Sequence, residues 1–120
     1  MKILIVDDSK AMRMIVKRTL RQAGFGDHEI IEAEDGQQGL EQVQSESPGL
    51  VLSDWNMPNM NGIEFLRALR AAGIDTNFGF VTSESSGEMR AEASSAGAMF
   101  LITKPFTADS FKSELSKVVD

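Results

Sequence analysis

The chain has 120 residues, a size that fits one domain with a core of its own. Its net charge of −6 argues against binding to nucleic acid or to an anionic membrane surface, and no apolar run approaches the length of a membrane span. The absence of cysteine excludes disulfides and thiol chemistry, so we expect a soluble, cytoplasmic protein.

The first predicted element is a short apolar run that ends in two acids. Residues 2–6 read KILIV, which is typical of a strand buried on both faces, and Asp7 and Asp8 follow directly. One of these acids could simply cap the next helix. Capping needs only one of them, so the pair favours a metal site.

A helix is predicted from its cap, Ser9, to about Ala23, where Gly24 stops it. Helical spacing predicts a buried face made of Met12, Ile15, Val16, Leu20 and Ala23. The remaining surface carries the basic residues Lys10, Arg13, Lys17, Arg18 and Arg21. A solvated face is the slightly favoured interpretation of this surface, and a docking patch for an acidic partner is the alternative.

The next stretch alternates apolar and polar residues and then becomes helical. Residues 29–34 predict an edge strand, and residues 37–45 predict a helix after the turn at Asp35 and Gly36. Pro48 and Gly49 end this helix before the third strand.

The stretch 50–62, LVLSDWNMPNMNG, holds the third strand and the most informative acid. Its apolar start predicts a buried strand, and Pro58 with the Asn-rich tail ends it, so Asp54 lies at the carboxyl end. Trp55 is predicted to be a half-exposed loop residue.

Ligands of open parallel sheets bind at the carboxyl ends of the strands. If the first and third strands are neighbours, Asp7, Asp8 and Asp54 converge there. Adjacent carboxylates raise one another's pKa unless a cation intervenes, and hard oxygen ligands with open positions suit Mg²⁺.

The second half of the chain continues the alternation of strands and helices. A third helix begins at residues 61–62, packs Ile63, Leu66, Ala68, Leu69 and Ala72 inward, and ends at Gly73. Strands are predicted at 78–81, ending at Thr82, and at 99–102, ahead of Lys104 and Pro105. The helix at 89–96 has poor propensity and is expected to be the least stable, and a last helix is predicted at 110–119.

These landmarks resemble the receiver domain of the two-component response regulators over the whole chain. The residues that carry the resemblance, each at a strand end, are Asp7, Asp8, Asp54, Thr82 and the pair Lys104 and Pro105. The resemblance implies a flavodoxin-like (βα)5 α/β fold, a three-layer sandwich around a five-stranded parallel sheet of order 2-1-3-4-5. It also implies one receiver domain spanning residues 1–120, with no output domain.

The same resemblance implies roles for single residues. Asp54 is expected to accept a phosphoryl group, while Thr82 and Lys104 contact its oxygens. Mg²⁺ is expected on the carboxylates of Asp8 and Asp54 and the backbone carbonyl of Asn56, with Asp7 bound directly or through water. The peptide bond between Lys104 and Pro105 is expected to be cis, as is typical of the family.

Residues around the acceptor resemble the chemotaxis subgroup of the family. The sequence DWNMP and the pair Ser83 and Glu84 carry this similarity. In the family, the positions of Asn56 and Glu84 tune hydrolysis of the phosphoryl group, and a small residue such as Ser83 leaves the acceptor accessible.

One departure from the family concerns the strand-five switch residue, which is usually aromatic. Leu101 occupies its position, and Phe100 cannot replace it because neighbours on a strand point to opposite faces. We expect Leu101 to stay turned inward in both states and not to act as the gate.

The expected function is signalling rather than enzymatic turnover. A histidine kinase or phosphotransfer domain would phosphorylate Asp54, and the face of the fourth helix, fifth strand and fifth helix would then change its affinity for a protein target. A phosphate sink or relay intermediate without a target is an alternative. A Mg²⁺-dependent aspartyl phosphatase is less favoured because residues 7–9 lack the Asp-x-Asp pattern of those enzymes. A non-catalytic binding module of flavodoxin type is also less favoured, because no glycine-rich phosphate loop follows the first strand.

Overall fold

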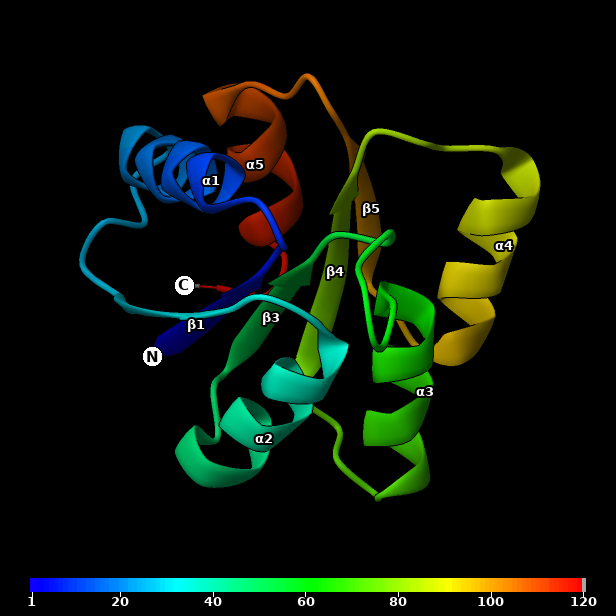
Figure 1. The fold of residues 1–120 in the computed structure, drawn as a ribbon. Helices are drawn as coiled ribbons and strands as arrows, with labels where there is room; N and C mark the ends of the chain where they lie inside the picture. Colours follow the sequence, from blue (N-terminus) through cyan, green and yellow to red (C-terminus); the bar gives the residue numbers. More distant parts are fainter. Residues whose placement is uncertain (120) are drawn as a thin grey trace.

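The computed structural model describes residues 1–119, and within them five strands alternate with five helices (Figure 1). The strands are β1 (Lys2–Val6), β2 (Glu29–Ala33), β3 (Leu50–Ser53), β4 (Asn77–Thr82) and β5 (Phe100–Thr103). The helices are α1 (Lys10–Gln22), α2 (Gly36–Glu46), α3 (Gly62–Ala71), α4 (Gly87–Ala96) and α5 (Ala108–Leu115). No helix in this part of the chain is long and apolar enough to cross a membrane.

The strands form one parallel sheet in the order β2-β1-β3-β4-β5, which confirms the predicted topology. Figure 1 shows α1 and α5 on one face of the sheet and α2, α3 and α4 on the other. The register pairs Val6 with Ala33 on one side and with Ser53 on the other. The residues that follow β1 and β3, Asp7 and Asp54, are therefore brought side by side at the carboxyl edge.

The core consists of two clusters, one on each face of the sheet. Ile3 and Ile5 of β1 pack in the cluster under α1 and α5, whereas Leu4 and Val6 pack in the cluster under α2, α3 and α4. This alternation follows from the two-residue period of a strand and explains why β1 reads as continuously apolar.

Trp55 is buried, and the prediction of a half-exposed loop residue is wrong. Its side chain is 8% exposed, and its ring centroid lies 4.7 Å from that of Phe80 on β4. The loop after β3 folds back over the sheet, because Gly62 at the start of α3 donates a backbone hydrogen bond to the carbonyl of Trp55. Burial of the large aromatic surface stabilises this arrangement.

The predicted faces of two helices need correction. In α1, Arg13 is buried and Ile15 is 40% exposed, the reverse of the prediction. Arg13 can be buried because two hydrogen-bond acceptors meet its guanidinium, which removes the cost of an unpaired charge. In α3, Phe65 is buried, because its aromatic ring packs against Gly39 of α2. Ala72, predicted to pack inward, is the exposed C-cap residue of this helix.

Helix boundaries differ slightly from the sequence-based ranges. Helix α5 ends at Leu115 rather than at Val119, because residues 116–118 form a turn in which Val118 donates to the carbonyl of Leu115. Ser86 caps α4 and starts it at Gly87, two residues before the predicted start. Within α4, Ala93 is the buried residue, and the expectation that this helix is the least stable stays a prediction.

Candidate functional site

The predicted site residues meet at the carboxyl edge of the sheet. Backbone hydrogen bonds extend the strand pairing past the strand ends: Asp54 N–H donates to the Val6 carbonyl at 2.9 Å, and Lys104 N–H donates to the Thr82 carbonyl at 2.7 Å. Four neighbouring strands therefore hold the residues that follow them in fixed register. Short-range sequence reasoning and the parallel topology together account for this convergence.

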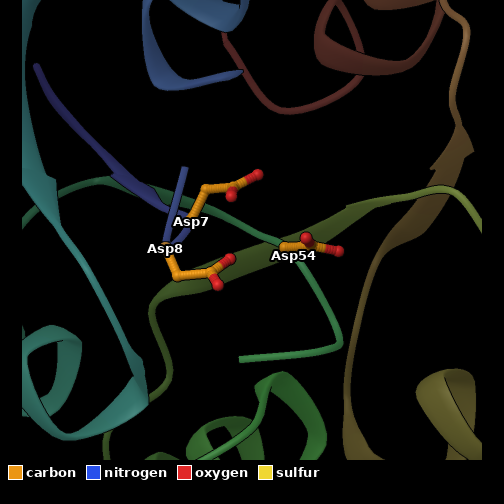
Figure 2. Close-up of side chains that lie close together, drawn as sticks. All are labelled: Asp7, Asp8 and Asp54. Carbon is orange, nitrogen blue, oxygen red and sulfur yellow. The ribbon is translucent and has the colours of Figure 1, made fainter. Parts of the chain in front are cut away.

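Figure 2 shows the side chains of Asp7, Asp8 and Asp54 lying close together. One carboxylate oxygen from each lies within 4.8 Å of the others. Asp7 is buried, Asp54 is half-buried and Asp8 is exposed. The predicted cluster is thus present, and it opens to solvent on the side of Asp8.

Lys104 reaches two of these acids from the loop after β5. Its Nζ atom lies 3.2 Å from Asp7 Oδ2 and 3.3 Å from Asp54 Oδ2. The second oxygens are held by the backbone, since Ser9 N–H donates to Asp7 Oδ1 at 2.9 Å and Trp55 N–H donates to Asp54 Oδ1 at 2.7 Å. Both carboxylates are therefore fixed in orientation before any ligand arrives.

Charge in the site is unbalanced, because one ammonium faces three carboxylates. Burial raises the pKa of Asp7 above its ordinary value, and the charge of Asp54 acts in the same direction; the hydrogen bond from Ser9 and the charge of Lys104 oppose this. The ionised form of Asp7 is consequently less favoured than that of a solvent-exposed aspartate. A divalent cation would offset the excess negative charge, and the all-oxygen donor set matches the preference of Mg²⁺.

The remaining predicted phosphoryl-contacting residue, Thr82, ends β4 and is fully buried. Its hydroxyl accepts a hydrogen bond from Glu84 N–H at 3.4 Å, which ties it to the loop that follows. The peptide bond between Lys104 and Pro105 is cis, as expected. The contacts of Thr82 and Lys104 with a phosphoryl group stay predictions.

The predicted tuning residues lie at the rim of the site. Asn56 Nδ2 donates to Glu84 Oε1 at 3.3 Å, which links the loops after β3 and β4, and Ser83 beside them is exposed. Leu101 is half-buried in the cluster under α2, α3 and α4, whereas Phe100 is buried on the opposite face. The expectation that these neighbours point to opposite faces is confirmed.

Two residues near the site were missed by sequence reasoning. Arg13 contacts the backbone of Asp7 from α1, and Gly62 lies directly beneath the backbone of Asp54. The spacing of Arg13 to Val16 and Leu20 places it on the apolar face of the helix and could have identified it. Gly62 cannot carry a side chain because a Cβ atom there would collide with the Asp54 carbonyl, and the sequence alone does not reveal this contact.

Fold and site together define the receiver class of flavodoxin-like α/β domains. A five-stranded sheet in this order, with acids after β1 and β3 and a lysine after β5, is the arrangement expected for that class. A family model described as the response regulator receiver domain matches residues 3–116, and the chain belongs to this family.

The relatives and solved structures that resemble the chain include chemotaxis proteins. The chain is 40% identical to the chemotaxis protein CheY of Pseudomonas aeruginosa, covering 100% of this chain and 97% of that protein. It is 41% identical to the chemotaxis protein CheY-3 of Vibrio cholerae, over 100% of this chain and 92% of the relative. The crystallised CheY4 of Vibrio cholerae superimposes with a TM-score of 0.86 at 35% identity, covering 98% of each chain.

Proposed function

We propose that this protein is a phosphoacceptor of a two-component system, in which a histidine kinase or phosphotransfer domain passes a phosphoryl group to Asp54. The observation that carries the proposal is the position of the Asp54 carboxylate. This carboxylate lies between Lys104 and the two acids that follow β1, Asp7 and Asp8. One of its oxygens accepts from Trp55 N–H and the other from the Lys104 ammonium. The resemblance to chemotaxis proteins favours a role in chemotaxis-type signalling in the cytoplasm.

In the proposed reaction, an oxygen of Asp54 attacks the phosphorus atom and the phosphorus–nitrogen bond of a phosphohistidine breaks. The electron pair of that bond leaves with the imidazole nitrogen of the donor. Mg²⁺, held by Asp7, Asp8, Asp54 and the Asn56 carbonyl, would neutralise charge on the phosphoryl oxygens. Lys104 adds a point charge, and Thr82 donates its hydroxyl to another oxygen of the bound group.

The acceptor reaction can be tested without the natural kinase. Incubation with acetyl phosphate and Mg²⁺ should add one phosphoryl group per chain, measured by intact mass, and chelation of Mg²⁺ should prevent it. A Mg²⁺-dependent phosphatase would instead turn over an added phosphate ester without a stoichiometric limit. Turnover of that kind, with no labelled protein, would contradict the proposal.

The output of the proposed reaction is a change of affinity for a protein target at the face formed by α4, β5 and α5. This face carries a cavity of about 410 Å³, and its lining includes Arg90, Leu101 and Phe106. Arg90 joins α4 to β5 by donating to the Leu101 carbonyl at 3.4 Å and to Thr103 Oγ1 at 3.2 Å. These two hydrogen bonds are exposed, and Ala93 is the buried residue of α4, so we expect this helix to move at a lower cost in free energy than the elements of the core.

The packing of Leu101 supports a second candidate, a phosphate sink or relay intermediate without its own target. Leu101 lacks the polar tip that lets an aromatic switch residue exchange between water and core, and it already packs in the cluster under α4. We expect a beryllofluoride adduct to move the loop after β4 and α4 while Leu101 keeps its rotamer. A pair of structures, with and without the adduct, checks this; a rotamer change of Leu101 with α4 unmoved would contradict it.

A further inference from the structure

Among the three acids of the site, Asp8 is held differently from the other two. Asp7 and Asp54 each have both carboxylate oxygens hydrogen-bonded, to a backbone N–H and to Lys104. Within residues 1–119, the exposed carboxylate of Asp8 accepts no hydrogen bond, yet its oxygen lies within 4.8 Å of the other two acids. The place of its carboxylate therefore depends on the backbone that carries it and on the rotamers that this backbone allows.

That backbone is held by Arg13, one turn into α1. Arg13 Nη1 donates to the Asp7 carbonyl at 2.6 Å, and this bond is buried. The Asp7 carbonyl belongs to the peptide group that joins Asp7 to Asp8. Because a peptide group is planar, fixing this carbonyl also fixes the direction of the Asp8 N–H and the start of the Asp8 residue.

Arg13 is itself anchored, so it can act as a fixed support. Its Nε atom donates to Glu32 Oε1 on β2 at 2.9 Å, and Lys17 donates to Glu32 Oε2 at 3.0 Å. Burial alone would raise the pKa of Glu32, but the hydrogen bonds from Lys17 and Arg13 lower it below its usual value. Glu32 is therefore ionised at neutral pH and holds the guanidinium in place.

We propose that Arg13 is a positioning residue that aims the Asp8 carboxylate at the metal site by holding the peptide group between Asp7 and Asp8. This inference rests on the proposed function, in which Asp8 is a ligand of Mg²⁺. Arg13 makes no contact with the reacting atoms. Its effect is indirect: the hydrogen bond to the Asp7 carbonyl fixes the backbone, and the fixed backbone limits the rotamers that the Asp8 side chain can adopt.

Positioning by Arg13 and the charge of Arg13 predict opposite changes in Mg²⁺ affinity when Arg13 is replaced. Arg13 is a cation close to a cation site, so removing its charge should strengthen Mg²⁺ binding if charge alone mattered. Loss of the hydrogen bond to the Asp7 carbonyl should weaken Mg²⁺ binding, because Asp8 is no longer held in the ligand position.

The test uses the Arg13→Met variant, which keeps much of the buried side-chain volume but donates no hydrogen bond. Mg²⁺ titration followed by Trp55 fluorescence should show a Kd raised about 10- to 100-fold, the effect typical of losing a group that orients a metal ligand. The Mg²⁺ concentration that gives half-maximal labelling by acetyl phosphate should rise in parallel with the Kd. The matched control is Glu32→Gln, which removes a neighbouring charge but keeps a hydrogen-bond acceptor for Arg13. Its Kd for Mg²⁺ should change less than about 3-fold, compared with a rise of at least about 10-fold for Arg13→Met.

A double variant separates positioning from a general effect on folding. In an Asp8→Ala background, Arg13→Met should raise the Kd no further, because the ligand through which Arg13 acts is gone. If Arg13→Met does not fold, Arg13→Lys replaces it. A lysine ammonium cannot reproduce the planar fork in which Nε bonds Glu32 and Nη1 bonds the Asp7 carbonyl, so its Kd should also rise.

Three outcomes would overturn the proposal. The first is an unchanged or lowered Kd for Mg²⁺ in the folded Arg13 variant. The second is a rise of the Kd in Glu32→Gln equal to that in Arg13→Met. The third is a further rise of the Kd when Arg13→Met is added to Asp8→Ala, as large as in the wild-type background. Loss of thermal stability with an unchanged Kd would show a structural role alone. Failure of the wild-type protein to respond to Mg²⁺ would instead refute the metal site of the proposed function, so the two failures are distinguishable.

Discussion

Replacing Asp54 by asparagine is expected to reduce phosphorylation by acetyl phosphate and Mg²⁺ to background. The amide is nearly the same size and its oxygen can still accept the hydrogen bond from Trp55 N–H, so the loop after β3 keeps its geometry. The variant loses the charged oxygen that we propose attacks phosphorus, and Asp54 is the only acid between the end of β3 and the start of α3. Intact-mass measurement after incubation reads out the result.

The same substitution is expected to leave the protein folded. The charge of Asp54 helps to raise the pKa of Asp7, so its removal brings that pKa back toward the ordinary value and relieves repulsion in the metal-free site. Lys104 retains its ion pair with Asp7. Thermal unfolding should therefore show a midpoint at or above that of the wild type, which separates loss of the acceptor from loss of the fold.

Asp35→Asn provides the matched control for this prediction. Asp35 is also a buried acid at the carboxyl end of a strand, but it caps α2 by accepting from Gln38 N–H at 2.8 Å and binds Asn59 Nδ2 at 2.8 Å. Asparagine is an adequate cap, so labelling should persist. Full labelling of Asp54→Asn, or equal loss of labelling in both variants, would show that Asp54 is not the acceptor.

Much of the fold follows from local sequence because the strands carry their own signal. The run Lys2–Val6 is apolar at nearly every position, as a strand covered on both faces must be, and the turn residues after Val6 and Leu52 place the acids at strand ends. Once the strands are parallel and β1 neighbours β3, convergence of Asp7 and Asp54 needs no further information. The main part of the site was therefore predictable.

The features that escaped prediction depend on contacts between distant segments. Trp55 is buried because Phe80, which lies on another strand, meets its ring, and no pattern around Trp55 encodes that partner. Arg13 is buried because it forms an ion pair with Glu32 on β2. The charge that suggested a solvated or docking surface is therefore paired inside the protein. A charge reversal at Arg13 would disturb the fold and cannot report on kinase docking.

Gly62→Ala is expected to cost about 3 kcal/mol of unfolding free energy, a large part of the stability of a domain this size. A Cβ atom at Gly62 would lie 2.2 Å from the Asp54 carbonyl oxygen and 2.8 Å from Phe80 Cε1. Such contacts cannot be relieved by rotating a flexible side chain, because the first partner is backbone. Either the start of α3 or the segment that carries Asp54 must move.

The displacement should damage the site as well as the fold. Gly62 N–H donates to the Trp55 carbonyl at 2.8 Å, so the start of α3 and the residue beside Asp54 are held together by the same close approach. Chemical denaturation should show the lower free energy of unfolding, with a melting midpoint lowered by about 10 °C. The rate of labelling by acetyl phosphate should fall in the fraction that remains folded.

Gly87→Ala is the control that isolates the close approach from the general effect of replacing glycine. Gly87 is the first residue of α4, and a Cβ there would meet no atom within 4 Å. Alanine at this position reduces the freedom of the unfolded chain, so it should stabilise the protein by about 0.5 kcal/mol. Equal tolerance of alanine at Gly62 and at Gly87 would mean that α3 can withdraw freely from Asp54. The geometry of Asp54 would then be set by β3 and its hydrogen bonds alone, without support from the helix that follows.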